Sequence, residues 1–363
     1  MKNFKYFLIS SLAFAFAVSC NDGIDPISKV DPGPDLTAPS VTISFPIEGT
    51  QIRAEEEPAS VIIKFEAKDD IELVTVSVKL DNAEIVKYDD FKDYRQITQE
   101  YLVSNLMNGD HTLSIVATDL SGKATTQTVN FQKTTPYVAL YEGEVLYLPF
   151  DGDYTEQITN TPATKVGSPD FADGKVGRAY AGVPDSYLTF PTTNLIKTAA
   201  VSGVFWMKVN GVPDRAGILT VSAEDKAPAV PGTQNLRTKG FRFFRELDGT
   251  LERLKLNVGT GAGETWNDGE TVNPALAEWV HIAFTVSGTT TKIYINGAKA
   301  LKPDGVLTAP IDWTGCDLLT IMSGIPRFTE WEHFSDLSLL DELRIFNKEL
   351  TQDEVTIIYN AEK

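Results

Sequence analysis

Short runs in which apolar and polar residues alternate constrain the fold of this chain more than any other feature. Alternation with a period of two places every second side chain on the same face, which is the pattern of a half-buried β-strand. Several such runs, separated by turn residues within about a hundred positions, predict an antiparallel β-sandwich. Between residues 40 and 133 the runs are 41–45, 61–67, 73–80, 84–88, 99–103, 111–117 and 126–131.

One stretch of this first region also resembles a known kind of domain. Residues 108–122, which contain the Asn108-Gly109 turn, are similar to the penultimate strand and following turn of bacterial immunoglobulin-like domains. The resemblance implies that residues 40–133 form an immunoglobulin-like sandwich. His111 opens the strand, and we interpret it as a solvated strand-edge residue rather than a catalytic one.

A second β-rich region, residues 134–363, ends in a helix. Residues 241–247 and 251–258 flank an Asp-Gly pair, which is a strong hairpin signal. Near the C-terminus, Thr351 and Glu354 have the spacing of a capping box, and apolar residues follow at helical intervals. We therefore predict one short C-terminal helix on an otherwise all-β region.

The second region resembles laminin-G-like, concanavalin-A-like jelly rolls. The segments that carry the likeness occur in the family's order: 147–153, 177–182 with 187–190, 204–208, 279–284, 292–297 and 340–351. The resemblance implies two packed antiparallel sheets. On one strand we expect Val280, Ile282, Phe284 and Val286 to point inward. Trp279 and His281 should lie on the opposite sheet surface. The predicted fold class is thus all-β, an immunoglobulin-like sandwich followed by a jelly roll with a short C-terminal helix.

Catalytic motifs of jelly-roll enzymes are missing from the sequence. Retaining glucanases use two carboxylates about 5 Å apart, usually on one strand. The nearest string runs from Glu246 to Glu252, but its spacing is too long and its Asp-Gly turn would place the two glutamates on different strands. No Gly-x-Ser-x-Gly elbow, metalloprotease motif or Walker loop occurs either. We therefore expect a protein that is not an enzyme.

Sugar recognition is the chemistry that remains. Aromatic faces pack on the apolar side of a pyranose, and carboxylates, amides and arginine bond its hydroxyls. Three predicted loops supply such groups: Trp266, Asn267 and Asp268; Trp313; and Arg327, Glu330 and Trp331, with His333 beside them. The alternative for each tryptophan is that it caps a sheet edge, and we favour that for Trp313. Trp206 and Trp279 fall within fold-defining strands and are interpreted as packing residues.

Calcium is an alternative ligand, because many laminin-G-like domains bind it through loop oxygens. Asp151 follows the first strand, and Asp341 shares strand parity with Leu343 and Ile345, which would turn it inward. A buried carboxylate needs a partner. That partner is calcium shared with Asp151, or Arg178 or backbone N–H groups. We favour the metal-free arrangement, so no cofactor is required and structural calcium stays the alternative.

The N-terminus predicts export. Two lysines precede an apolar stretch at residues 7–18 that is too short to span a bilayer. Residues 17–20, Ala-Val-Ser-Cys, resemble a bacterial lipobox, which implies that residues 1–20 are a lipoprotein signal and that Cys20 carries the lipid. A plain signal peptide with a chance cysteine is the alternative. The Pro- and Asp-rich segment 21–39 is expected to be a solvated tether.

The net charge of the chain disfavours some classes of binding partner. The net charge is -18 and the pI is about 4.6, which argues against nucleic acid and against adsorption to anionic lipid. Contact with a membrane is therefore expected through the lipid anchor only. The chain's 3 histidines are too scattered for a zinc motif.

The predicted function is glycan binding by an outer-membrane lipoprotein that faces the cell surface or the periplasm. The chain resembles accessory lipoproteins of Bacteroidetes polysaccharide-utilisation systems, which implies polysaccharide as ligand and a transporter or hydrolases as partners. An adhesin that binds a protein partner is the main alternative. A glycoside hydrolase or lyase with an unrecognised active site is the other.

Overall fold

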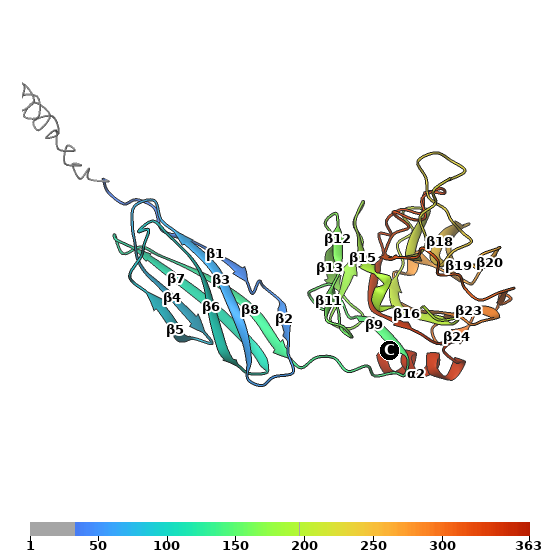
Figure 1. The fold of residues 1–363 in the computed structure, drawn as a ribbon, viewed down its shortest axis with the longest axis horizontal. Helices are drawn as coiled ribbons and strands as arrows, with labels where there is room; N and C mark the ends of the chain where they lie inside the picture. The colour runs from blue at the N-terminus through green and yellow to red at the C-terminus, as the bar shows by residue number, and fades with distance from the viewer. Residues whose placement is uncertain (1–32, 196) are drawn as a thin grey trace, which may run out of the picture. The chain divides into compact units, whose positions relative to one another are not determined.

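The computed structural model describes residues 33–195 and 197–363 of the chain. The predicted signal segment, its lipidation residue Cys20 and residues 21–32 of the predicted tether lie outside the described residues. Across the described ranges, no helix combines the length and the hydropathy needed to cross a bilayer. The regular structure is almost entirely β, as the alternating pattern predicts (Figure 1).

The N-terminal sandwich consists of two sheets. Its strands are β1 (Ser40–Phe45), β2 (Thr50–Arg53), β3 (Ala59–Lys68), β4 (Leu73–Leu80), β5 (Ala83–Tyr88), β6 (Gln96–Leu106), β7 (Gly109–Asp119) and β8 (Ala124–Thr134). One sheet has the order β1-β3-β6, and the other has the order β2-β8-β7-β4-β5. Every run that alternation marks lies in one of these strands. The short β2, which lacks alternation, was not predicted, and it pairs with β8 in parallel rather than antiparallel.

One residue near the end of the predicted tether contacts the N-terminal sandwich. The Asp35 side chain is only 7% exposed. The Lys123 ammonium, next to the turn after β7, donates a hydrogen bond to the Asp35 carbonyl at 2.8 Å. Asp35 is therefore held against the sandwich, whereas residues 36–38 between it and β1 are exposed.

The C-terminal region contains two larger sheets. The β16 sheet has the order β13 (Asp170–Asp173), β14 (Arg178–Ala181), β27 (Leu339–Phe346), β16 (Val201–Lys208), β22 (Val280–Val286), β23 (Thr290–Ile295), β24 (Ala298–Lys299), with β9 (Glu144–Leu148) beside β27 and β25 (Gly305–Val306) beside β23. The β18 sheet has the order β12 (Thr164–Val166), β15 (Tyr187–Pro191), β26 (Leu318–Ile321), β17 (Arg215–Val221), β18 (Phe241–Asp248), β19 (Leu251–Gly259), β20 (Glu264–Asn267), with β21 (Thr271–Val272) beside β19. A hairpin, β10 (Thr155–Glu156) with β11 (Thr161–Pro162), and two 3-10 turns, η1 (Thr192–Asn194) and η2 (Pro274–Leu276), complete the described elements together with the helix α2 (Gln352–Glu362).

The main core lies between the inner faces of these two sheets. Ile282, Phe284 and Val286 of β22 are fully buried there, and the partly buried Val280 packs against the same core, so the predicted inward row is confirmed. Phe284 stacks on Phe243 of β18 with ring centroids 5.0 Å apart. Each such buried aromatic side chain contributes about 1.5–3 kcal/mol through the area it removes from water. Interdigitating rings of this kind fix the two sheets as a sandwich.

Helix α2 covers the outer face of the β16 sheet. Thr351 and Glu354 form the predicted capping box. Val355 and Ile358 of α2 pack with Val204 and other residues of that outer face in a second small core. His281 lies on this face as predicted, but it is fully buried rather than exposed, because the helix and Trp206 cover it.

Candidate functional site

The outer face of the β18 sheet carries polar and aromatic side chains instead of a second apolar core. Alternation along β18 sends Phe243 to the inner core and turns Phe244 and Glu246 to this outer face. Strand pairing extends the set sideways, because Phe244 faces Lys255 on β19. Directly paired residues share a face of the sheet. Charged and aromatic groups from neighbouring strands are thereby brought together.

The segment between β26 and β27, residues 322–338, crosses over this outer face. Phe328 and His333 from this covering loop stack with centroids 4.3 Å apart, and His333 packs edge-on to Phe244 at 4.7 Å. Both Phe328 and His333 are fully buried. The covering loop is thus anchored by rings on the sheet, and it holds Trp331 above the next strands.

Beside the covering loop lies a groove of about 480 Å³, which we call the tryptophan groove. Its lining residues are Arg215, Glu246, Lys255, Trp266, Asp268 and Trp331. The rings of Trp266 and Trp331 lie 6.2 Å apart at an interplanar angle of 37°. Both tryptophans are only partly buried. Two aromatic faces therefore meet at an accessible concave surface.

Charged side chains lie close to these two rings. The Lys255 ammonium lies 3.1 Å from Glu246, 3.2 Å from Asp268 and 5.4 Å from the Trp266 ring centre. A hydrogen bond from His333 and the nearby Lys255 charge outweigh burial and lower the pKa of Glu246 to about 2. Arg215 donates a hydrogen bond to the Trp331 carbonyl at 3.2 Å. The groove accordingly offers ionised acceptors, cationic donors and aromatic faces within one small surface.

Some of the predicted ligand residues meet in this groove and others do not. Trp266, Asp268 and Trp331 line it together. Asn267 does not, because strand alternation turns it to the other side, where its amide donates to the Thr291 carbonyl at 2.9 Å and its oxygen accepts from Gly269. Asn267 is a buried turn residue at the end of β20 rather than a loop ligand.

Arg327 and Glu330 hold the covering loop instead of lining the groove. Arg327 pairs with Asp317 at 3.1 Å. The Glu330 carboxylate accepts a hydrogen bond from the Asn235 amide. These two predicted ligand residues therefore tie the loop to its neighbours.

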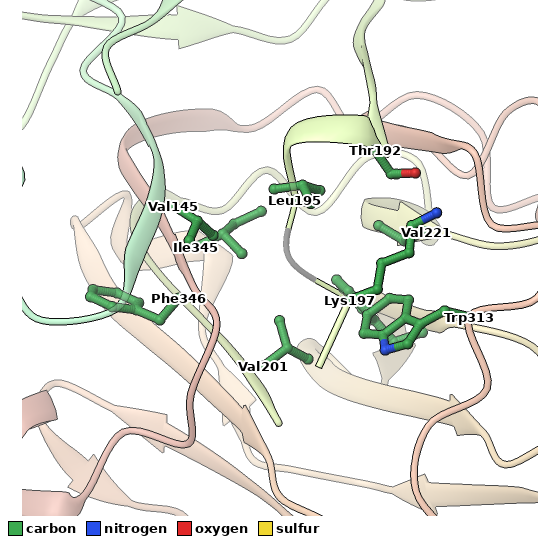
Figure 2. A pocket seen from close by; sticks show the side chains of 10 residues that line it. Val145, Thr192, Leu195, Lys197, Val201, Val221, Trp313, Ile345 and Phe346 are labelled. Carbon is green, nitrogen blue, oxygen red and sulfur yellow. The ribbon is translucent and has the colours of Figure 1, made fainter. Parts of the chain in front are cut away.

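Trp313 lies on the core side of the fold. Its ring packs edge-on to Phe241 of the core at 6.1 Å, and its indole N–H donates to the Thr198 carbonyl at 2.8 Å. Figure 2 shows Trp313 beside Lys197 in a cavity walled mainly by aliphatic side chains such as Val201. That cavity has about 20 Å³ of usable space, enough for about one water molecule. Trp313 is thus a packing residue, which is the alternative the sequence favoured.

Asp151 and Asp341, the pair considered for calcium, both accept hydrogen bonds from backbone N–H groups. The Asp341 carboxylate accepts from the backbone N–H groups of Lys175 and Val176 at 2.7 and 2.9 Å, and burial raises its pKa to about 8. Asp151 accepts from the Arg178 N–H at 2.8 Å. Backbone donors, the other option for this pair, occupy both carboxylates.

Asp341 also does not point into the main core. Leu340, Leu343 and Ile345 of β27 are core residues. The alternation slips between Leu340 and Leu343, where Glu342 has a φ of 51° and the register with β16 shifts. Asp341 consequently shares the outer side with its partner Trp206. An irregularity of this kind breaks the parity on which the inward expectation rested.

Sequence reasoning missed Arg215, Glu246 and Lys255 as groove residues. The hairpin between β18 and β19 carried a usable signal, since a two-residue turn fixes the cross-strand register. That register places Glu246 opposite Arg253 and Phe244 opposite Lys255. Arg215 had no such local signal, because its pairing with Glu246 joins strands separated by a long loop. The same hairpin does put Glu246 and Glu252 on different strands, as expected.

The comparisons with known proteins agree with this architecture. Residues 181–356 match the Laminin_G_3 family model, described as the concanavalin A-like lectin/glucanases superfamily. The C-terminal part of the chain therefore contains a concanavalin A-like jelly-roll domain with a lectin-like fold. No curated protein sequence is significantly similar to the chain.

Several solved structures are similar to part of the chain at low identity. Domain 4 of AbnA, a GH43 extracellular arabinanase from Geobacillus stearothermophilus solved with arabinotriose, is 21% identical with a TM-score of 0.44, over 60% of this chain and 98% of that one. The binding domain of botulinum neurotoxin serotype D/C is 13% identical with a TM-score of 0.43, over 61% and 53%. The binding domain of Paraclostridial Mosquitocidal Protein 1 is 13% identical with a TM-score of 0.44, over 61% and 52%. This chain thus spans about half the length of the two toxin domains, and likenesses at this level bear on neither ligand nor activity.

Proposed function

We propose that the jelly roll binds carbohydrate in the tryptophan groove. The observation that carries the proposal is the pairing of Trp266 and Trp331 at 6.2 Å beside an ionised carboxylate and an ammonium group. A sugar ring presents an apolar face of C–H groups and a rim of hydroxyls. Aromatic side chains suit the first, and charged donors and acceptors suit the second.

We further propose that the groove binds its glycan without cleaving it. Hydrolysis of a glycosidic bond needs a carboxylic acid that is protonated near neutral pH and a second carboxylate across the bond. Glu246 has the opposite property, since its lowered pKa keeps it ionised. Glu252, the nearest partner in sequence, is buried and pairs with Arg245 at 2.9 Å. No cofactor is needed for such binding.

In this proposal the chain is an exported lipoprotein. Cys20 anchors it in the outer membrane, facing the surface or the periplasm, and the N-terminal sandwich serves as an immunoglobulin-like spacer. An anchored module gains effective concentration without tight intrinsic affinity. Its role would be accessory to polysaccharide capture, beside a transporter or hydrolases, and its net charge of -18 disfavours nucleic acid.

Binding to a glycan array, followed by affinity electrophoresis in the selected polysaccharide, tests the groove. Trp266→Ala and Trp331→Ala should each weaken binding about tenfold or more, as expected for central aromatic anchors. Trp279→Ala is the matched control, because this partly buried tryptophan precedes β22 in the other sheet. Unchanged binding in both groove variants would refute the site. Binding to a protein and to no glycan would favour an adhesin, and release of reducing ends would overturn the non-enzymatic proposal.

The anchor needs a separate test. Cells that express the full chain should incorporate labelled palmitate into it, and Cys20→Ser should abolish the label and release the protein from the membrane fraction. Label that persists in the Cys20→Ser protein would contradict lipidation at this residue.

A further inference from the structure

Three aspartates meet at one end of the N-terminal sandwich, which we call the aspartate cluster. Asp35 precedes β1, Asp69 follows β3, and Asp119 ends β7. One carboxylate oxygen of each lies within 4.8 Å of the others. Asp69 and Asp119 are buried, and the side chains of Asp35 and Asp119 are 7% and 0% exposed.

Asp69 and Asp119 each use one oxygen to fix their own loop and leave the other free. Oδ2 of Asp69 accepts from the N–H groups of Ile71 and Glu72, both at 2.8 Å. Oδ1 of Asp119 accepts from the Lys123 N–H at 2.8 Å. Oδ1 of Asp69 and Oδ2 of Asp119 are buried and accept no hydrogen bond from any described residue. The loops thus hold two unused oxygens in a set geometry.

Asp35 completes the cluster from a distant part of the sequence. Neither of its carboxylate oxygens has a hydrogen-bond partner within the described part of the chain, although both are buried. Leaving an ionised carboxylate buried without hydrogen bonds is costly. The unused oxygens of all three residues point to a ligand that accepts electron pairs.

A lysine beside the aspartate cluster offsets only part of this charge. The Lys123 ammonium lies 3.5 Å from Asp35 and 3.9 Å from Asp119, and it spends hydrogen bonds on the Asp35 carbonyl and the Ser121 hydroxyl. Three carboxylates against one ammonium leave two negative charges, which is the charge that one divalent cation neutralises.

We propose that Asp35, Asp69 and Asp119 bind one calcium ion that pins the segment before β1 to the N-terminal sandwich. All of the ligand atoms are hard oxygens from three separate segments, and Ca²⁺ accepts such irregular sets and completes them with water or carbonyls. Mg²⁺ requires a near-ideal octahedron and usually takes only one or two carboxylates. The ion would stiffen the end of the tether, independently of what the jelly roll binds.

The test is calcium uptake by the purified, EDTA-treated chain, measured by isothermal titration calorimetry and by equilibrium dialysis with ⁴⁵Ca. The wild-type protein should bind one more ion than Asp35→Asn and Asp119→Asn, with no equivalent uptake of magnesium. Asp90→Asn removes the same charge from an exposed loop and should bind like wild type. Asp151→Asn should also keep the site, which separates it from any calcium at the jelly roll.

Equal uptake by wild type and by folded Asp35→Asn and Asp119→Asn would overturn the proposal, as would a lack of uptake by wild type. Circular dichroism establishes that the variants are folded. If an asparagine variant does not fold, the wild-type protein decides through limited proteolysis. Calcium should then protect residues 33–39 from cleavage at least several-fold, and equal cleavage in calcium and in EDTA would overturn the proposal.

Discussion

The outer faces of the two jelly-roll sheets carry similar side chains, but helix α2 covers one face and the covering loop crosses the other. On the β16 sheet, Trp206 lies opposite His281 with ring centroids 5.2 Å apart. On the β18 sheet side, Trp331 lies near His333 at 6.4 Å. Helix α2 seals the first face, and Trp206 is only 3% exposed. The covering loop over the second face leaves the tryptophan groove open. The covering element, rather than the type of side chain, therefore decides which of the two tryptophan–histidine clusters is accessible to a ligand.

The charged groups of the two faces differ in the same way. Arg344 on the β16 sheet binds Glu144, Glu342 and Glu362 at 2.6, 2.9 and 3.0 Å, and none of these four side chains is more than 8% exposed. Lys255 in the groove also bridges two carboxylates, but it is 20% exposed and Asp268 is 61% exposed. The buried Arg344 network satisfies its charges internally. The exposed Lys255 network can exchange its ion pairs for contacts with a ligand.

The largest expected effect comes from making the same truncation on both faces. Trp206→Ala removes a buried ring together with its hydrogen bond to Glu362, and we expect a loss of about 3–5 kcal/mol in the free energy of unfolding. Trp331→Ala removes a partly exposed ring, and we expect a loss of about 1 kcal/mol or less. Urea denaturation followed by circular dichroism measures both. Equal losses would show that the groove tryptophan is a packing residue as well, which would break the comparison.

The sequence predicts features that depend on local patterns better than features that depend on contacts between distant residues. Alternation, the Asp-Gly turn and the capping box are local signals, so the strands, the β18–β19 hairpin and α2 are predicted well. Burial of His281 depends on a helix about seventy residues further along the chain, and no local pattern reports it. The slip at Glu342 likewise reversed the side on which Asp341 lies.

The groove is predictable only in part for the same reason. Trp266, Asp268 and Trp331 stand out by residue type, since exposed aromatics beside charges are uncommon. Arg215 and Glu246 face each other only because β17 pairs with β18. Residues 266–268 were expected to be a loop, which is why Asn267 was included. Trp266 and Asn267 instead end strand β20 and point to opposite faces of its sheet.

The next largest expected effect is a pH dependence of stability that arises from His281, on the outer face of the β16 sheet beneath α2. Burial lowers the pKa of His281 to about 4, and neither ring nitrogen has a hydrogen-bond partner among the described residues. Since the unfolded value is near 6.5, the folded state binds the proton more weakly. Stability from the neutral ring is therefore fully present above pH 6.5 and is lost as the pH falls toward 4, by up to about 3 kcal/mol.

His281→Phe tests this assignment. The variant should be at least as stable as wild type at pH 7, because an apolar ring replaces two unsatisfied nitrogens. It should also lose less stability than wild type between pH 6.5 and 4. Urea melts at several pH values measure the difference between the two proteins, in which the shared acid response of the carboxylates cancels. Parallel pH profiles would show that His281 is not the group that titrates.

The smallest expected effect concerns the N-terminus of helix α2. Thr351→Ala removes the hydroxyl that accepts from the Glu354 N–H at 3.2 Å, and N-cap losses of this type cost about 1 kcal/mol. Thr351→Ser keeps the capping oxygen and is the matched control. Because α2 covers only the β16 sheet, glycan binding in the tryptophan groove should be unchanged in both variants while hydrogen exchange in α2 rises in Thr351→Ala alone. A loss of glycan affinity on uncapping α2 would mean that the two faces are coupled through the core, and that the sealed face also shapes the open one.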